Sequence, residues 1–462
     1  MSARRAILLR VAGLFIPLFA FSTPTATNVA VIDARNVLVR HFDGWGVSLC
    51  WWANVVGGYT NREEYADLAF KQLGLNIVRY NIGGGENPAR SNTMEFRARV
   101  PGFQPERDKW DWRADVNQRW MLRAAVARGA NHVVAFANSP PYWMTHSGSV
   151  TGARRGTNDN LRPEFETPFA DYLATVVSNL TILDGVKFDT ITPMNEPSAG
   201  WWQLGHRQEG THMSVAQQQR MINELRSALD QRGVRATIVA SEDNDERSTC
   251  ECVSAYDPVT LGNISHIVTH TYTANASAQL RHLAERSGKP LWVSEYGDGE
   301  RSGLLLARRI RNDIVEKRAQ AWIYWQFADN AGAWGLVNNR LNGRDASYRL
   351  TRKFHVMSQF SRFIRPGCQI IHVNDGDSLA AYDRDRRQLV MVSVNDRRDS
   401  RTATFELKGI KAVTALVSSY RTSQTEDMVP QAPVSVVDSQ FAAMLPARSV
   451  STFIIPDVEL LR

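Results

Sequence analysis

Short apolar runs alternate with amphipathic segments over most of the sequence. The runs are rich in β-branched and aromatic residues and are bounded by turn residues, a pattern that predicts buried strands. They occupy residues 42–49, 75–82, 132–139, 188–195, 236–243, 265–272, 290–297 and 321–328. Helical patterns fill residues 62–74, 115–129, 167–180, 214–233, 277–288 and 302–317. Glycine stands where four of these helices should end, at Gly74, Gly129, Gly233 and Gly288.

This alternation of strands and helices predicts an α/β fold of the (β/α)8 TIM-barrel type over residues 41–355. An open doubly wound sheet would show the same alternation. That fold is expected to carry a GxGxxG loop after a strand, and the glycines at 83–85 do not have this spacing. The sequence therefore favours the barrel.

The pattern changes after residue 356, where helical periodicity stops and short alternating strands take over. These strands are expected at 377–384, 387–396, 402–409, 412–420 and 447–456. They predict a small antiparallel β-sandwich over residues 356–462. The alternating segment 27–40 reads as an edge strand that joins this second domain.

Residues 1–26 have the pattern of a secretory signal peptide. Arg4 and Arg5 precede an apolar run over 7–21, and small residues follow over 22–26. A membrane anchor is the alternative, but the run is too short and too interrupted to span ~30 Å of hydrocarbon. We therefore expect a secreted, extracellular protein without a membrane anchor.

The composition is that of an ordinary globular protein, with 43% hydrophobic and 22% charged residues. The formal net charge is +7. Lys and Arg are scattered among acids rather than gathered in blocks, so nucleic-acid binding is not favoured. We expect a monomer whose partner is a polysaccharide or oligosaccharide substrate.

Four cysteines and three glycosylation sequons fit a secreted protein. The cysteines are Cys50, Cys250, Cys252 and Cys368, and they allow three disulfide pairings among which the sequence does not choose. The sequons stand at Asn179, Asn263 and Asn275. The Cys250–Cys252 pair lacks the matching ligands of a zinc site. No metal ion and no cofactor is expected.

Two glutamates stand directly after apolar strands, at the barrel edge where TIM-barrel active sites lie. They are Glu196 in TITPMNEP and Glu295 in LWVSEYGD. Glycoside hydrolysis needs such a pair, one carboxyl to give a proton and one carboxylate on the opposite face of the sugar. Glu242, at the end of the fifth strand, is a rival. Either member of the pair could instead be a salt-bridged strand-end residue, for example with Arg79.

An acidic cluster follows Glu242, at Asp243, Asp245 and Glu246. It lacks the spacing of a calcium-binding loop. We interpret it as a solvated loop.

Tryptophans gather at the same predicted strand ends and in the loops beyond them. The sequence holds 13 of them. Indole rings stack on the C–H faces of sugars while polar side chains bind the hydroxyls, and such a mixture is typical of a small-ligand site. We expect Trp143 and Trp325 to face the ligand, whereas Trp120, Trp292 and Trp322 fit core positions better.

At these residues the sequence resembles glycoside hydrolase family 30 over nearly its whole length after the signal segment. The resemblance rests on the order and spacing of seven motifs: FDGWGVSLCWWA (42–53), LNIVRYNIGGG (75–85), FANSPPYWM (136–144), MNEP (194–197), THTY (269–272), WVSEYGDG (292–299) and QFSRFIRPG (359–367). The loops at 51–59, 142–152 and 195–210 are similar to those of fungal endo-β-1,6-galactanases. FDGWG replaces the FDGFGG of many members, which puts the shape of the first strand's loop in doubt.

The resemblance implies a role for each matching residue. Glu196 would be the general acid/base and Glu295 the nucleophile. Asn195 would hold the sugar 2-hydroxyl, Arg79 would lie beside the nucleophile, Tyr272 would donate a hydrogen bond to it, and Trp143 and Trp325 would wall the sugar being cleaved. Looser candidates for sugar contacts are Trp45, Glu86, Trp201, Trp202, His206 and His270.

The resemblance further implies a secreted retaining endo-glycosidase that hydrolyses β-1,6-linked galactan, as in arabinogalactan side chains, without a metal. Glu196 would protonate the leaving oxygen while an ionised Glu295 attacks the anomeric carbon. One alternative keeps the mechanism but takes β-1,6-glucan, glucosylceramide or xylan. Another is a carbohydrate-binding protein without catalysis.

Overall fold

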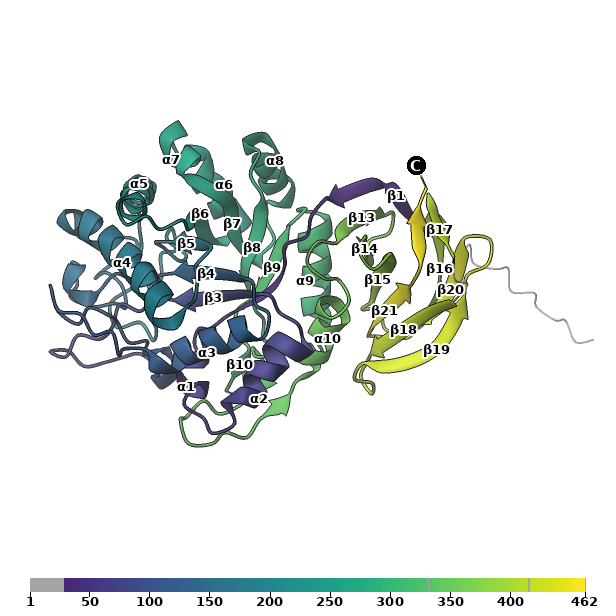
Figure 1. The fold of residues 1–462 in the computed structure, drawn as a ribbon, viewed down its shortest axis with the longest axis horizontal. Coiled ribbons are helices and arrows are strands. Elements are labelled where there is room, and N and C mark those ends of the chain that lie inside the picture. The colour runs from purple at the N-terminus through teal and green to yellow at the C-terminus, as the bar shows by residue number, and fades with distance from the viewer. Residues whose placement is uncertain (1–28, 331, 414–415, 462) are drawn as a thin grey trace, which may run out of the picture.

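Eight parallel strands close into a barrel, and a strand-rich domain stands beside it (Figure 1). The structure is a computed structural model that describes residues 29–330, 332–413 and 416–461. The signal segment expected at 1–26 lies outside the described residues.

The barrel strands follow one another in sequence order; six lie within the predicted runs, and the fifth and sixth strands of the barrel extend one or two residues beyond theirs. They are β2 (Gly44–Ser48), β3 (Ile77–Asn81), β4 (His132–Phe136), β5 (Thr190–Thr192), β6 (Thr237–Asp245), β7 (Ile264–Thr273), β8 (Leu291–Tyr296) and β9 (Ala321–Tyr324). Apolar side chains from several strands fill the interior, among them Ile77, Val134, Val239, Val268 and Ile323. The predicted TIM barrel is confirmed.

Helices surround the barrel, and their ends follow capping rules. They are α1 (Ala53–Val56), α2 (Arg62–Ala66), α3 (Val116–Ala127), α4 (Glu166–Asp184), α5 (Val215–Gln231), α6 (Glu246–Ala255), α7 (Pro258–Asn263), α8 (Ser277–Ser287), α9 (Leu304–Val315) and α10 (Arg352–Ser361). Gly74, Gly129, Gly233 and Gly288 all have positive φ, as their predicted place at helix ends requires.

The acidic cluster after Glu242 is not a solvated loop. Asp243 is buried and accepts hydrogen bonds from the hydroxyls of Ser198 and Ser241. Asp245 caps α6 by accepting from the backbone N–H groups of its first turn. Glu246 is fully buried and pairs with Lys317. Each carboxylate therefore has a structural partner, which the sequence did not reveal.

The second domain is a curled nine-stranded sheet with a two-stranded ribbon. The nine strands run in the order β19 (Val429–Ser435), β18 (Leu416–Thr422), β21 (Ser449–Ile455), β15 (Gln388–Asn395), β14 (Ser378–Asp383), β13 (Gln369–Val373), β1 (Val29–Val39), β16 (Arg401–Lys408) and β20 (Gln440–Leu445). The ribbon pairs β17 (Ile410–Ala412) with β22 (Val458–Leu460). The sheet is mixed rather than purely antiparallel, because β1 pairs with β16 in parallel and with β13 in antiparallel orientation.

The N-terminal strand β1 thus lies inside the C-terminal domain, where Figure 1 shows it in purple among green and yellow strands. The chain then leaves this sheet to enter the barrel at β2. A small sheet of β10 (Ala328–Asp329), β11 (Val337–Asn338) and β12 (Arg349–Leu350) follows the last barrel strand.

Helices α9 and α10 lie between the barrel and the second domain (Figure 1). Gln359 of α10 is fully buried there. Its side-chain amide donates to the hydroxyl of Thr422 (2.8 Å), and its side-chain oxygen accepts from the hydroxyl of Thr452 (2.6 Å). Polar groups buried in such a contact must be hydrogen-bonded, so this glutamine fixes how the two parts meet.

None of the described helices is long and apolar enough to cross a membrane. All four cysteines are free thiols.

We expect the replacement Gln359→Ala to lower the free energy of unfolding by about 1–3 kcal/mol, because it removes the buried side-chain hydrogen bonds to Thr422 and Thr452. Urea unfolding followed by circular dichroism measures this. Gln440→Ala, an exposed change in β20, should stay within about 0.5 kcal/mol of the parent. Equal losses for both variants would contradict this account of the contact.

Candidate functional site

Glu196 lies in the loop after β5, on a sharply turned backbone with φ of +48°. Its N–H donates to the carbonyl of Glu242 (2.8 Å). Its own carbonyl accepts from the indole N–H of Trp202 (2.9 Å). Two backbone hydrogen bonds therefore fix this carboxyl at the carboxyl-terminal edge of the barrel, where side chains of several strands converge.

Glu295 lies at the end of β8 and is held through both oxygens. The hydroxyl of Tyr272 donates to its Oε1 (2.8 Å). Nη1 of Arg79 donates to its Oε2 (2.7 Å). The residue is only 3% exposed, so these two donors set the direction of the carboxylate.

The two carboxyl groups face one another at short range. One oxygen of Glu196, one oxygen of Glu295 and Nδ1 of His270 all lie within 4.8 Å of one another. Residues that are 99 positions apart in sequence therefore share one site. The sequence predicted this pair, and the structure places it together.

Arg79 reaches four neighbours from the middle of β3, and one of them is the hydroxyl of Ser48 (3.2 Å). Besides Glu295, it donates from Nη2 to the side-chain oxygen of Asn195 (2.7 Å) and to Oε2 of Glu242 (3.2 Å). The guanidinium is fully buried and lies over the ring of Phe136, 3.5 Å from its centroid. A cation here is surrounded by acceptors and an aromatic face, the two environments that stabilise a buried guanidinium.

His270 of β7 lies between three carboxylates. Its Nδ1 is 3.2 Å from Oε1 of Glu196 and 3.4 Å from Oε1 of Glu295. Its Nε2 is 3.2 Å from Oε2 of Glu242. The side-chain amide of Asn244 also donates to Oε1 of Glu196 (2.6 Å).

Burial and charge pull the protonation equilibria of this cluster in opposite directions. Burial alone would lower the pKa of His270, but the surrounding carboxylates raise it to about 10. Burial raises the pKa of Glu295 above its ordinary value, since His270 and Arg79 only partly offset it. Burial also acts to raise the pKa of Glu242, but Arg79 and His270 outweigh it and the pKa is lowered. At neutral pH the site therefore holds an imidazolium and a guanidinium among carboxylates.

The trio of Glu196, His270 and Glu295 has enough ligand atoms for a metal ion on distance alone. A metal needs the lone pair of a neutral imidazole. The raised pKa of His270 keeps a proton there instead. A metal ion would therefore have to displace a proton from His270 at neutral pH.

Comparison with known proteins identifies the family. A family model described as O-glycosyl hydrolase family 30 matches residues 31–283. The endo-beta-1,6-galactanase of Hypocrea rufa is 31% identical over 455 residues, which cover 91% of this chain and 93% of that protein. The chain belongs to O-glycosyl hydrolase family 30.

Other similar proteins carry different names. An exo-beta-1,6-galactobiohydrolase of Bifidobacterium longum is 25% identical over 88% of this chain, although the match covers only 37% of that longer protein. Among solved structures, a conserved exported protein from Bacteroides fragilis has a TM-score of 0.81 at 22% identity, with 93% of this chain and 100% of that chain covered. A family 30 subfamily 8 xylanase from Clostridium acetobutylicum has a TM-score of 0.73 at 22% identity over the same shares. These structures show the shared barrel and β-domain.

Within this family 30 glycosidase, six of the candidate residues meet in one hydrogen-bonded cluster. They are Arg79, Asn195, Glu196, His270, Tyr272 and Glu295. Trp325 lies beside this cluster. Its ring packs edge-on against Trp51 (5.8 Å between centroids) and against the apolar group that includes Phe136, the ring beneath Arg79.

The expectation that Trp45 contacts sugar is wrong. Trp45 is fully buried, and its indole N–H donates to the carbonyl of Ile364 (2.7 Å). Its ring packs against Phe42, Trp322 and Phe360. It belongs to the core beneath the barrel rather than to the substrate site.

The three candidates in the loop after Glu196 have different positions. Trp202 is buried and holds the backbone of Glu196, so it lacks a surface for a ligand. Trp201 is 45% exposed and meets Trp202 edge-on. His206 is half-buried against the same ring, 5.3 Å between centroids. Trp201 and His206 are therefore the two that remain accessible.

Trp143 lies apart from the hydrogen-bonded cluster. Its indole N–H donates to the carbonyl of Gln104 (3.0 Å), and its ring packs edge-on against Phe165. It lines a groove of about 270 Å³ that Trp110 and Tyr172 also line. The role of Trp143 as a wall beside Glu196 and Glu295 therefore stays a prediction.

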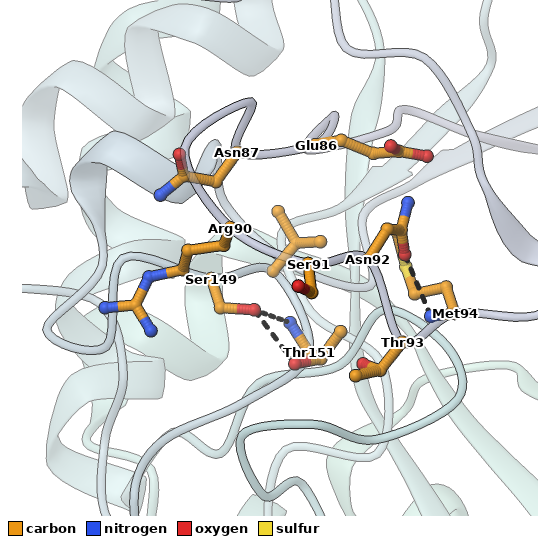
Figure 2. Close-up of a pocket in the computed structure, with 10 residues that line it drawn as sticks. Glu86, Asn87, Arg90, Ser91, Asn92, Thr93, Met94, Ser149 and Thr151 are labelled. Atoms are coloured by element: carbon orange, nitrogen blue, oxygen red, sulfur yellow. Dashed lines mark hydrogen bonds between the residues drawn. The ribbon is translucent and has the colours of Figure 1, made fainter.

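Glu86 lies at a small hollow in the loop after β3. Figure 2 shows its carboxylate and the guanidinium of Arg90 pointing away from each other. The cavity volume is about 30 Å³, enough for about two water molecules but not for a sugar ring. Glu86 is exposed at the edge of this hollow.

The sequence reasoning missed the polar residues that support the pair. Glu242 was considered only as a rival catalyst, and Asn244 and Ser294 were not considered. Ser294 donates to Oε2 of Glu242 (2.6 Å). Asn244 directly follows one predicted strand, and Ser294 lies within another, next to Glu295. These positions were the only sequence signal for either residue.

We expect Trp45→Ala to destabilise the protein by about 3–5 kcal/mol, because it leaves a large cavity and an unpaired carbonyl at Ile364. Urea unfolding measures the change. Trp201→Ala, at an exposed ring, should cost less than about 1 kcal/mol. If the two variants were equally destabilised, Trp45 would not have the core role assigned to it.

Proposed function

We propose that this family 30 glycosidase is a retaining endo-β-1,6-galactanase acting on β-1,6-linked galactan, such as arabinogalactan side chains. The observation that carries the proposal is the pair Glu196 and Glu295, whose nearest ligand oxygens lie within 4.8 Å. Retaining glycosidases hold their carboxyl groups ~5–5.5 Å apart, and inverting ones ~6.5–9.5 Å to admit a water. The short separation supports double displacement.

The relatives support the choice of substrate. The Hypocrea rufa protein, 31% identical over 91% of this chain, is an endo-beta-1,6-galactanase. The Bifidobacterium longum relative is an exo-beta-1,6-galactobiohydrolase. The names of both relatives refer to β-1,6-linked galactose, so we assign this linkage to the substrate.

In the first step Glu196 gives its proton to the leaving oxygen while Glu295 attacks the anomeric carbon. The bond from that carbon to the leaving oxygen breaks, and a glycosyl ester forms on Glu295. Arg79 and Tyr272 both donate to Glu295, so they direct it and favour its ionised form.

Asn195 supports the sugar in the same step. Its side-chain oxygen accepts from Arg79, so its amide NH2 remains for a sugar hydroxyl. Trp325 offers a partly exposed ring on the side of Glu295. In the second step Glu196 takes a proton from water, which attacks the anomeric carbon and releases Glu295.

Product analysis tests the proposal. The panel contains β-1,6-galactan, β-1,3-galactan, β-1,6-glucan, xylan and glucosylceramide, and proton NMR follows the anomer released first. We expect oligomers of β-1,6-galactose in the β configuration. Preference for another glycan would refute the substrate, and an α product would refute retention.

We expect Glu295→Gln to lower turnover at least about 10⁴-fold, because the amide does not attack the anomeric carbon. Folding should persist, since Arg79 keeps Glu242 and Asn195 as partners. Initial rates on β-1,6-galactan, thermal unfolding and calorimetric substrate binding measure the three properties. Near-normal turnover would exclude Glu295 as the nucleophile.

The variant Tyr272→Phe should move the acid limb of activity to higher pH. The hydroxyl of Tyr272 lowers the pKa of Glu295, so its removal raises that pKa further above the ordinary value. Activity needs ionised Glu295 and is lost as the pH falls through the pKa of Glu295. Because this pKa is higher in the variant, the variant loses activity at a higher pH. The measurement is kcat/KM against pH. The control is Tyr65→Phe, which removes a hydroxyl bound to the carbonyl of Ala346 and should leave the acid limb of the pH profile in place. An acid limb that does not move in Tyr272→Phe would contradict the role given to the Tyr272 hydroxyl.

A further inference from the structure

Glu242 is a third carboxylate, which the two-carboxylate mechanism does not use. It lies at the bulged end of β6, fully buried, with φ of +63°. One oxygen, Oε2, receives all its hydrogen bonds: from Ser294 (2.6 Å), Arg79 (3.2 Å) and His270 (3.2 Å). A carboxylate buried in this way is costly unless its charge is balanced.

Both ring nitrogens of His270 face carboxylate oxygens, Nε2 toward Glu242 and Nδ1 toward Glu196 and Glu295. A neutral imidazole has a single N–H, so one of these contacts would place two lone pairs against each other. A protonated Glu196 would satisfy Nδ1, but ionised Glu295 lies 3.4 Å from the same nitrogen and favours the imidazolium. The other charged or titratable groups facing the ring are Tyr272 of β7 and, through Glu242 and Glu295, Arg79 of β3.

The charges of the cluster balance in both halves of the reaction. The retaining mechanism starts from a protonated Glu196, and the two positive groups, Arg79 and His270, then balance the negative Glu242 and Glu295. In the glycosyl-enzyme Glu295 is an uncharged ester and Glu196 carries the negative charge. Nδ1 of His270 lies within 3.2 Å and 3.4 Å of these two positions.

We propose that Glu242 is a positioning residue that holds His270 as an imidazolium, whose Nδ1–H balances the negative charge as it passes from Glu295 to Glu196. The inference rests on the retaining mechanism proposed above. Without Glu242 the cluster would have one excess positive charge, and His270 would lose the partner of its Nε2. A fixed cation between the two positions costs no reorganisation during the step, which is the advantage of a preorganised site.

The test follows the ring nitrogens of His270 by NMR in protein labelled with ¹⁵N-histidine. His270→Gln identifies its signals by their absence. In the parent we expect imidazolium shifts from about pH 5 to about pH 9, because the surrounding charges hold the proton. In Glu242→Gln, which keeps the shape and removes the charge, the ring should titrate within this range.

The kinetic arm uses the same variants on β-1,6-galactan. Glu242→Gln should lower kcat about 10²- to 10³-fold with little change in KM, since the lost stabilisation acts on charge in the transition state. Glu242→Asp keeps the charge, so it should keep the imidazolium signal and recover part of kcat. If Glu242→Gln does not fold, Glu242→Asp and His270→Gln still measure the two effects.

The matched control is Glu166→Gln, which removes a buried carboxylate paired with Arg220 between α4 and α5. It should change neither kcat nor the His270 signals. The proposal is overturned if His270 titrates near neutrality in the parent, if it stays an imidazolium in Glu242→Gln, or if Glu242→Asp behaves as Glu242→Gln does. The NMR result does not depend on turnover, so a failure of the galactanase assignment would appear separately, in the product analysis.

Discussion

The buried guanidinium of Arg79 connects the ends of four barrel strands. It leaves β3 and meets Asn195 beyond β5, Glu242 at the end of β6 and Glu295 at the end of β8. Each of these partners would be costly to bury alone, and the carboxylates would also repel one another. One cation therefore makes it possible to gather several acidic groups in a dry site. His270 supplies the second cation, at the same oxygen of Glu242 that Arg79 contacts.

The barrel backbone departs from regular geometry where these groups lie. Glu196 and Glu242 both have positive φ, and their backbones are joined by the hydrogen bond from the N–H of Glu196 to the carbonyl of Glu242. Bulges between Ser241 and Asp243 and between Thr269 and His270 shift the register of β6 and β7. Bulges re-aim side chains, and strained backbone persists only where surrounding contacts hold it. The hydrogen bonds from Trp202 to Glu196 and from Ser294 to Glu242 are among those contacts.

The sequence predicted the parts of the structure that depend on repeating patterns. Strand and helix positions follow from periodicity, and the pairing of Glu196 with Glu295 follows from the rule that barrel strands end at a common edge. Side-chain direction was harder to predict. Trp45 and Trp325 both lie within predicted strands, but Trp45 points into the core whereas Trp325 lies beside the site. The acidic run from Asp243 to Glu246 looked solvated because its partners, Ser198 and Lys317, are distant in sequence.

Loops that are far apart in sequence are joined by hydrogen bonds near Glu196. The hydroxyl of Thr93 donates to the carbonyl of His206, and the N–H of Gly205 donates to the hydroxyl of Thr151. Trp202, in the same loop, holds the carbonyl of Glu196. A change in any of these loops is therefore transmitted to the others and to the backbone of the acid. Because loops vary more than the scaffold that carries them, relatives with the same barrel can differ in the glycan they cut.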